Sequence, residues 1–376
     1  MTLHLSYRPS MTIRDRLDRW ENAVRRDAEV GPGNWRMLAV WPAARDASVS
    51  GSTGIEGNPL DPTQVQEVLA GAAVNADGAH VREVENYNRA LNLARDASLR
   101  PDFRWSHEIL HVINATVMGG LPRDTHGNYR GPGEDVLVGI FTGPSPLLVQ
   151  TLMDELVAWL RRPSRTPRLV RSALLHLNMI AIHPFSDGNG RTARILAAME
   201  LILDGVRSPE LISIEAYLRR NRDEYVDALR TTLGPSYDPD NHPVTDWLDY
   251  YTGISLDRLE ARDRILDALP TDIGVLISAL ADAGEPLDWA VTLLAARVSR
   301  MRTAALAGLT GRSTPAARAE LGRMTRAGWL ETRGATRGRW YAPAERLTAI
   351  SLHVPELMRL LAAGDQLTLF DEELAR

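Results

Sequence analysis

The stretch HPFSDGNGRTAR, residues 183–194, carries the most information in this sequence. It lies between two segments, 168–182 and 191–203, in which apolar residues recur at the spacing of a helix. We therefore expect two helices that are joined by a tight polar loop. The residue types in this loop predict both the fold class and the chemistry.

Backbone N–H groups and arginines of this loop form a predicted polyphosphate site. Gly188, Asn189 and Gly190 let the chain turn tightly at the start of the second helix, so that N–H groups point at a single anion. Arg191 and Arg194 are three residues apart and hence lie on one face of that helix. Their two guanidinium groups can bind the same chain of phosphates.

Three further side chains of the loop complete a reaction centre. His183 belongs to the residue type that titrates near neutral pH, so it is the natural base for a hydroxyl nucleophile. Asp187 can bind a divalent cation that bridges phosphates. Phe185 should point away from the anion and into the apolar body. Together these residues predict transfer of a phosphate-containing group from a nucleotide to a hydroxyl, without a covalent enzyme intermediate.

The composition excludes several other chemistries. The 376-residue chain contains 43 Lys plus Arg, and all of them are arginine, since neither lysine nor cysteine occurs. Schiff-base chemistry, a P-loop lysine, thiol catalysis, disulfides and cysteine-bound metals are therefore excluded. The chain shows no apolar leader and no run of about 18 apolar residues. We expect a cytoplasmic protein without membrane contact.

The chain before residue 269 is patterned mostly for helices. Asp61 followed by proline is a typical helix start. The segment 127–140 contains four glycines and a proline between short β-prone pieces, and it predicts a small hairpin. We therefore predict a mainly α-helical bundle with one small hairpin. Further helical segments are expected at residues 81–95, 105–117 and 147–160.

A second unit is predicted after Leu269-Pro270. Three helical segments are followed by two short strands around a Gly/Arg turn, which is the order of a winged helix-turn-helix. Between Val291 and Arg346, eleven arginines against three glutamates give +8, although the whole chain carries −5. This asymmetry favours a module that faces duplex DNA, and a merely solvated basic face is the alternative. The candidate DNA contacts are Arg318 and Arg323 on the predicted recognition helix and Arg337 and Arg339 on the predicted wing.

The complete motif HPFSDGNGRTAR resembles the Fic motif of Fic-domain (Fido) protein adenylyltransferases, which transfer AMP from ATP to Ser, Thr or Tyr hydroxyls of proteins. The resemblance covers about residues 60–268. It implies a Fic-type helical bundle in which His183 is the base and Asp187 binds Mg²⁺ or Mn²⁺. It further implies that the nucleotide-binding residues are Gly188, Asn189 and Gly190 at the α- and β-phosphates, Arg191 at the β-phosphate, Arg194 at the γ-phosphate, and Asn221 and Tyr225 near the nucleoside.

Two other segments resemble regulatory and docking parts of this family. The hairpin predicted over 127–140 resembles the flap that binds a target segment as an additional strand. This likeness implies docking of the target protein by Tyr129, Arg130, Val136 and Leu137. Residues 52–58, STGIEGN, resemble the inhibitory pattern that precedes the Fic motif in one class of relatives.

The inhibitory pattern has a physical interpretation. The Glu56 carboxylate, paired with Arg194, would occupy the guanidinium group meant for the γ-phosphate. Ser52 and Gly57 are the other residues of the pattern. A plain glutamate at a helix end is the alternative. In some relatives the same glutamate positions a water that removes AMP, so a bifunctional enzyme also stays open.

We predict four regions: an N-terminal helical region (1–100), a Fic catalytic domain (101–268), a winged helix-turn-helix domain (269–346) and a tail (347–376). In the tail, Gln366–Phe370 resembles the QLxLF peptide by which bacterial proteins dock on the polymerase sliding clamp. A terminal amphipathic helix that packs on the core is the alternative. A homodimer is a further candidate assembly.

Two other functions remain open from the sequence. One is a DNA-binding transcriptional regulator that uses the Fic domain as a nucleotide sensor. The other is transfer of UMP or GMP by the same fold. An intact His183 and an intact Asp187 favour the enzyme, with ATP as co-substrate and a protein hydroxyl as acceptor.

Overall fold

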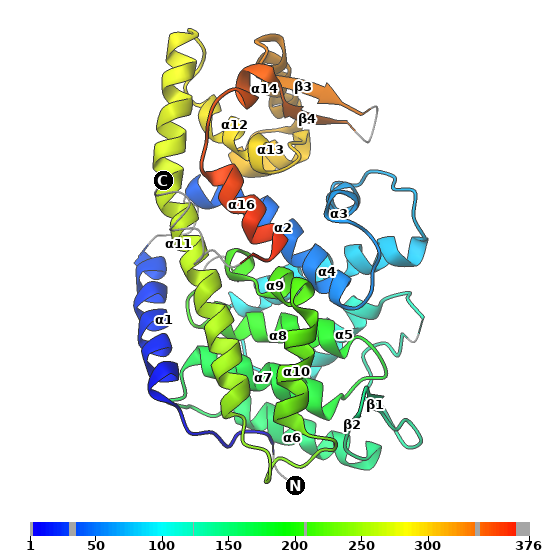
Figure 1. Cartoon of the computed structure of the whole chain (residues 1–376). Coiled ribbons are helices and arrows are strands. Elements are labelled where there is room, and N and C mark those ends of the chain that lie inside the picture. The colour runs from blue at the N-terminus through cyan, green and yellow to red at the C-terminus, as the bar shows by residue number, and fades with distance from the viewer. Residues whose placement is uncertain (1–2, 30–34, 123, 207–208, 335–338, 366–376) are drawn as a thin grey trace.

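The computed structural model describes residues 3–29, 35–122, 124–206, 209–334 and 339–365, which form a larger and a smaller lobe (Figure 1). The larger lobe contains α1 (Met11–Glu29), α3 (Pro62–Leu69), α4 (Gly78–Ser98), α5 (His107–Met118), β1 (Leu137–Val138), β2 (Phe141–Thr142), α6 (Pro146–Arg161), α7 (Arg168–Ile182), α8 (Asn189–Leu203), a 3₁₀ turn (Pro209–Ile212), α9 (Glu215–Arg220) and α10 (Arg222–Leu233). The smaller lobe, at the top of Figure 1, contains α12 (Trp289–Val298), α13 (Thr303–Thr310), α14 (Thr314–Arg326), β3 (Leu330–Arg333), β4 (Trp340–Pro343) and α15 (Glu345–Thr348). Helices α2 (Trp35–Ile55), α11 (Thr245–Asp282) and α16 (Val354–Ala363) contact both lobes, and α16 lies against α2 and α9 below the smaller lobe in Figure 1.

Helices α7 and α8 form the centre of the larger lobe and pack directly on each other. Nearly every side chain of α7 is buried, since neighbouring helices surround it. The joining loop turns back sharply because His183, with φ +51°, and Gly188, with φ +76°, both adopt the left-handed conformation. The two helices expected around this loop are confirmed, and the mainly α-helical fold with them.

The helix start predicted at Asp61 is confirmed in detail. The Asp61 side chain accepts a hydrogen bond from the backbone N–H of Gln64, and the Gln64 side-chain oxygen accepts one from the Asp61 N–H. This reciprocal pair satisfies two backbone donors that a helix start would otherwise leave free. The helices predicted over 81–95, 105–117 and 147–160 correspond to α4, α5 and α6.

Helix α11 is continuous for 38 residues, about 57 Å at 1.5 Å per residue. The expected break at Leu269-Pro270 is wrong, because Pro270 lies inside this helix. A proline in a helix interior removes one backbone hydrogen bond and costs about 3 kcal/mol. Leu269 and Ile273 on either side are buried in a hydrophobic cluster, and this packing holds the helix together across the proline.

The hairpin in the larger lobe is shorter than expected and lies further along the chain. Strands β1 and β2 pair antiparallel, with Val138 opposite Phe141. The prediction of a hairpin over 127–140 is therefore wrong in its bounds. Gly127 and Gly133 both take positive φ, so the first half of that segment forms turns instead of a strand. Gly139, with φ +59°, begins the two-residue turn between the strands.

The smaller lobe has three helices followed by a two-stranded hairpin. Helices α13 and α14 pack on each other, and α14 also packs on β3. Strands β3 and β4 pair antiparallel, from Leu330 opposite Pro343 to Arg333 opposite Trp340. Helix α13 was absent from the predicted pattern, and the remaining order agrees with it. The assignment of this unit as a winged helix stays a prediction.

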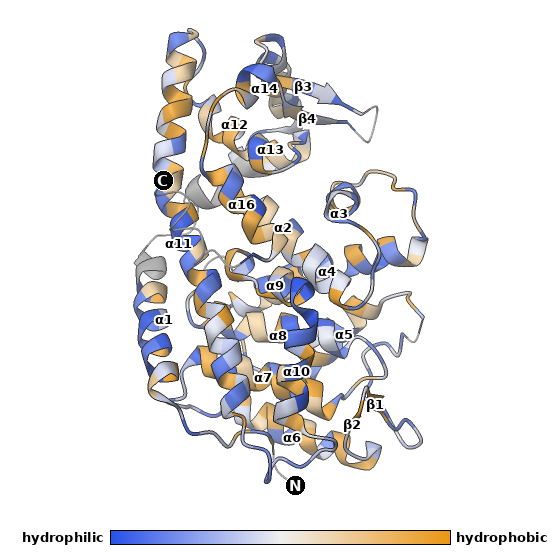
Figure 2. Ribbon diagram, in the orientation of Figure 1, coloured by the Kyte–Doolittle hydropathy of each residue, from blue (hydrophilic) through white to orange (hydrophobic). Residues whose placement is uncertain are grey.

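Hydrophobic clusters join the two lobes through α2. Its residues Ala39 and Val40 belong to the cluster of the smaller lobe, whereas Val49 and Ile55 belong to the two clusters of the larger lobe. Figure 2 shows hydrophobic and hydrophilic residues alternating along α11, which presents its apolar stripe to both lobes. Within the described part of the chain, we find no helix with the length and apolar composition that crossing a bilayer requires.

Candidate active site

His183 sits at the C-terminal end of α7 in a position to act as a base. Its N–H donates to the Met179 carbonyl oxygen at 3.1 Å, and its Nδ1 lies 3.4 Å from the Ile180 carbonyl oxygen. With the proton on Nδ1, Nε2 is left to accept another. Burial lowers the pKa of His183 from its usual 6.5, so the ring is neutral near pH 7.

The N-terminus of α8 faces a carboxylate of the chain itself. Gly188 precedes the helix, and a Cβ there would lie 2.8 Å from the Met118 sulfur, so only glycine fits. A Cβ on Gly190 would lie 2.4 Å from Glu56 Oε1. The Glu56 carboxylate therefore lies directly against the first turn of α8, where a helix attracts negative charge.

Asn189 uses its side chain to shape the loop. Its Oδ1 accepts from the Phe185 N–H at 2.9 Å, and its Nδ2 donates to the Phe185 carbonyl oxygen at 2.8 Å. Phe185 is fully buried, as expected from its spacing. The Asn189 side chain thus holds the loop just before α8 in place. Because its side chain is used in this way, only the backbone N–H of Asn189 is available to contact a nucleotide.

Arg194 is held by the two residues predicted to form an inhibitory contact. Its Nε donates to Ser52 Oγ at 2.8 Å, and its Nη2 donates to Glu56 Oε1 at 2.8 Å. The Arg194 side chain is 1% exposed and the Glu56 side chain 30%. Burial alone would raise the pKa of the Glu56 carboxyl, but Arg194 and Arg191 outweigh it and lower that pKa. Glu56 is therefore ionised at neutral pH, and its carboxylate forms an ion pair with Arg194.

Arg191 is paired with a second carboxylate that the sequence did not reveal. Its Nη1 donates to Glu83 Oε1 at 2.6 Å, and its Nη2 lies 3.4 Å from Asp187 Oδ1. Asn58, the last residue of the segment that resembles the inhibitory pattern, donates from Nδ2 to Glu83 Oε2 at 2.8 Å. Both arginines predicted to bind phosphates are thus engaged by carboxylates. Nothing in the local sequence around Glu83 marks it, because its partner lies more than a hundred residues away.

Asp187 offers one carboxylate for a divalent cation. Its Oδ1 accepts from the Gly188 N–H at 2.5 Å, and its carbonyl oxygen accepts from Asn114 Nδ2 at 3.1 Å. In the residues that the structure covers, no group of three or more His, Cys, Asp or Glu is arranged to hold a metal. Mg²⁺ commonly takes one or two protein carboxylates and completes its shell with phosphates and water. Asp187 fits such a partial site, whose other ligands a nucleotide would supply.

Arg130 is buried at the base of the flap and is not available for docking. It is 3% exposed, and its guanidinium donates to the carbonyl oxygens of His183, Pro144 and Ile182 at 2.8, 2.7 and 3.1 Å. The expectation that it contacts a target protein is therefore wrong. Five guanidinium donors suit this position, because several carbonyl oxygens converge there.

Tyr129 likewise supports the loop. It forms an isolated β-bridge with Phe185, and its hydroxyl lies 3.0 Å from His107 Nδ1. The apolar surface of the flap lies further along. Leu137 is 67% exposed and Val136 is half-buried, and docking of a target by these two residues stays a prediction.

The two residues assigned to the nucleoside side have structural partners. Asn221 joins α9 to α10, and its Nδ2 donates to the Tyr217 carbonyl oxygen at 3.1 Å. Tyr225 is 5% exposed, and its hydroxyl lies 2.9 Å from His176 Nε2. Burial raises the pKa of Tyr225 to about 12. Tyr225 thus lies in the core, close enough to Arg194 for the guanidinium charge to act on its pKa.

The arginines of the smaller lobe fall into two groups. Arg300 pairs with Glu67 at 2.6 Å, and Arg312 pairs with Glu320. By contrast, five exposed arginines have no carboxylate partner among the described residues: Arg318, Arg323 and Arg326 on α14, Arg339 before β4, and Arg346 on α15. Arg337 and the Gln366–Phe370 segment lie outside the described residues.

Comparisons with known proteins match the part of the chain that contains this loop. Residues 104–201 match the Fic/DOC family. The protein adenylyltransferase Fic of Aedes aegypti is 28% identical over 229 residues, which are 57% of this chain and 42% of that protein. A probable protein adenylyltransferase of Aquifex aeolicus is 29% identical over 126 residues, 31% of this chain and 37% of that one. The matched region thus spans less than half the length of these curated relatives.

Solved structures share the fold. A Fic family protein from Desulfovibrio desulfuricans superposes with a TM-score of 0.58 at 21% identity, over 90% of this chain and 98% of that one. Fic-1 of Caenorhabditis elegans gives a TM-score of 0.57 at 21% identity, over 68% and 73% of the two chains. The first of these matches includes most of the smaller lobe, since it covers nine-tenths of the chain.

Proposed function

This chain contains a Fic domain, and we propose that it is a protein adenylyltransferase that transfers AMP from ATP to a protein hydroxyl and is inhibited by its own Glu56. One observation carries the proposal most directly. The Glu56 carboxylate binds Arg194 and lies against Gly190, at the start of α8. A carboxylate of the chain thus occupies an anion site built from a helix N-terminus and an arginine.

The same groups can bind the triphosphate. With Glu56 displaced, Arg194 and the N–H groups of the first turn of α8 would face the phosphates, and Arg191 would reach them from the same helix face. Asp187 would hold the cation, Mg²⁺ or Mn²⁺, which neutralises phosphate charge when bound. Because these donors are fixed before substrate arrives, they can stabilise charge that develops on the transferred group.

His183 supplies the proton transfer. The acceptor hydroxyl oxygen forms a bond to the α-phosphorus while the bond from this phosphorus to the oxygen of the leaving pyrophosphate breaks. The hydroxyl proton moves to Nε2 of His183, the nitrogen that makes no contact with the Ile180 carbonyl oxygen. The lowered pKa of His183 keeps Nε2 unprotonated at neutral pH.

The flap is the candidate docking site for the acceptor. Leu137, Val138 and Ile140 are exposed apolar side chains on or beside the short hairpin. An extended target segment can pair with such an edge and place its hydroxyl over the loop. Arg130, anchored to the His183 carbonyl oxygen, fixes the distance between this edge and the base.

Labelling experiments test the proposal. We expect Glu56→Gly to raise self-AMPylation about tenfold or more over the wild type, a gain that corresponds to about 1.4 kcal/mol of barrier. Glu56→Gln, which removes only the charge, should give an intermediate rate. Intact-mass spectrometry with ATP, GTP, UTP and CTP then identifies the donor from the added mass.

The base is tested in the released enzyme. His183→Ala in the Glu56→Gly background should abolish labelling, because Asp187, the other proton acceptor of this loop, is assigned to the cation. Equal labelling of wild type and Glu56→Gly would remove the inhibitory role of Glu56. Full activity of the double variant would remove His183 from the role of base. A separate experiment adds wild type or Glu56→Gln to the labelled protein and measures the loss of AMP. Faster loss with the wild type would show that Glu56 also supports AMP removal.

A second candidate function concerns the smaller lobe. Arg318 and Arg323 are exposed, have no carboxylate partner among the described residues, and lie along α14, which follows α12 and α13 and precedes the β3–β4 hairpin. This arrangement favours a winged helix that places α14 in the major groove of duplex DNA. The chain would then be a DNA-bound regulator as well as, or instead of, an enzyme. Binding to duplex DNA that weakens with salt is its test.

A further inference from the structure

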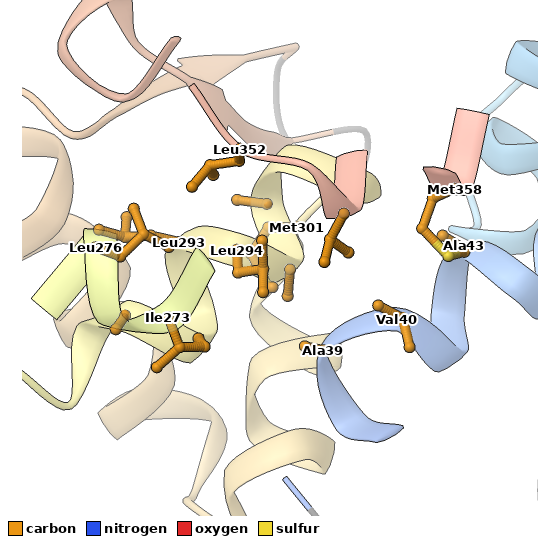
Figure 3. Close-up of a cluster of buried hydrophobic side chains, with 14 of the residues drawn as sticks. Ala39, Val40, Ala43, Ile273, Leu276, Leu293, Leu294, Met301, Leu352 and Met358 are labelled. Atoms are coloured by element: carbon orange, nitrogen blue, oxygen red, sulfur yellow. The ribbon is translucent and has the colours of Figure 1, made fainter. Parts of the chain in front are cut away.

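Helix α2 has one end in each lobe. Its C-terminal turn carries Ser52 and Glu56 into the candidate active site. Further toward its N-terminus, Ala39, Val40 and Ala43 are buried in the smaller lobe's hydrophobic cluster, which Figure 3 shows at close range. The partners there come from α11, α12, the segment after α12, the segment before α16, and α16: Ile273, Leu276, Leu293, Leu294, Met301, Leu352 and Met358.

Helix α2 packs so closely on the larger lobe that two of its positions have no room for a side chain. A Cβ on Gly51 would lie 2.5 Å from the Ala216 nitrogen of α9, and a Cβ on Gly54 would lie 2.3 Å from Arg219 Nε. Arg219 also donates to the Ser50 carbonyl oxygen at 3.1 Å. Because α2 is in contact with α9 on one side and with α16 and α12 on the other, a shift of the smaller lobe must move it.

The segment after the inhibitory residues is also attached to the smaller lobe. Helix α3 begins at Pro62, a few residues beyond Asn58. Arg300 Nη1 binds Glu67 Oε1 of α3 at 2.6 Å, and Arg302 Nη1 donates to the Ala70 carbonyl oxygen at the end of the same helix. The smaller lobe therefore contacts the elements on both sides of residues 52–58.

We propose that the smaller lobe controls the inhibitory contact: by holding α2 and α3 together it keeps Glu56 on Arg194, and a partner that displaces this lobe releases Glu56. This inference rests on the proposed function and names the regulation of the same site. About 20 Å of helix separates Ala43 from Glu56, since 13 residues rise 1.5 Å each. A helix of that length, packed on both sides, transmits a small displacement as a rigid body.

Two matched methionine variants test the attachment. Met358 of α16 lies beside Ala43 of α2 (Figure 3), whereas Met324 of α14 packs within the smaller lobe, and both are buried. We expect Met358→Ala to speed hydrogen exchange of the backbone amides of residues 52–58 by about fivefold or more, and Met324→Ala to leave it unchanged. Equal exchange in both variants would overturn the proposal. This readout requires no AMP transfer, so it decides the attachment even if Glu56→Gly is inactive and the proposed function fails.

The ion pair between the lobes gives a second test that does not endanger folding. Arg300→Glu should raise self-AMPylation about fivefold or more over the wild type, because it repels Glu67 and loosens α3. Glu67→Arg in the same chain should restore the pair and return labelling toward the wild-type rate. In the Glu56→Gly background, Arg300→Glu should add nothing, since the inhibitory contact is already gone. Labelling at the wild-type rate in Arg300→Glu, with Glu56→Gly active, would contradict control by the smaller lobe.

Discussion

At the scale of single residues, one loop contains most of the proposed chemistry. His183, Asp187 and the glycines at the start of α8 could be assigned roles from sequence because each role follows from residue type and spacing within twelve positions. The structure adds that this loop is held by long-range partners. Glu83 and Asn114 are the clearest cases, and their helices give no sign of it, since a polar residue on a helix usually faces water.

The pKa of His183 predicts a pH profile. We expect the labelling rate of Glu56→Gly to be level between about pH 7 and 8 and to fall with an apparent pKa below 6.5, because burial lowers the pKa of the ring and protonation removes the base. The Glu56 charge acts to raise that pKa, so its removal lowers it further. An apparent pKa above 6.5, measured from initial rates, would contradict this environment for His183.

At the scale of elements, regular periodicity was readily predicted and irregular segments were not. Amphipathic helices such as α5 and α6 follow from spacing alone. The predicted bounds of the hairpin are wrong because a cluster of glycines indicates turns without showing which of them joins the strands: Gly127 and Gly133 adopt other turns, and Gly139 begins the turn between β1 and β2. The unbroken α11 was missed because a proline normally ends a helix, and only the burial of its neighbours shows why it does not here.

The buried Arg130 at the start of the predicted flap should contribute to the stability of the protein. Arg130→Met should lower the free energy of unfolding by about 3 kcal/mol, because it leaves several buried carbonyl oxygens without donors. It should also slow labelling in the Glu56→Gly background, since Arg130 ties the flap to the loop of His183. Urea unfolding followed by fluorescence measures the first effect. Arg162→Met, at an exposed position, is the matched control and should change stability by about 0.5 kcal/mol or less.

If Arg130→Met and Arg162→Met unfold at the same urea concentration, Arg130 does not fasten the flap. If Arg130→Met loses stability but labels at an unchanged rate, Arg130 stabilises the fold without contributing to activity. The predicted flap would then not need Arg130 to bind a target.

At the scale of the whole molecule, the order of the units along the chain can be predicted from the sequence, but the packing of α2 against both lobes cannot. The apolar residues of α2 have the same spacing whichever cluster they join, so nothing in the sequence shows that Ala39 and Ile55 are buried in different lobes. The smaller lobe carries an excess of arginines, but ion pairs within the protein neutralise part of this positive charge, since Arg300 and Arg312 pair with carboxylates.

The remaining arginines predict how the molecule would bind DNA. Arg318→Ala and Arg323→Ala should each weaken binding to duplex DNA and lower the salt slope by about 1, if each contacts a phosphate. Arg230→Ala on α10, an exposed arginine of the larger lobe, is the control and should change neither quantity. Mobility shifts at a series of salt concentrations measure the slope. No shift at about 50 mM salt, or equal slopes for all three variants, would exclude this partner.

The contact between Glu56 and Arg194 can also be described as competition between a tethered and a free ligand. A carboxylate attached to its own binding site acts at an effective concentration on the order of millimolar or above, and a rigid tether such as α2 raises it further. Doubling the ATP concentration can then shift the occupancy of Arg194 by no more than about twofold. Detaching α2 removes the competitor altogether. Activity in this molecule should consequently respond steeply to whatever moves α2, and only weakly to the supply of nucleotide.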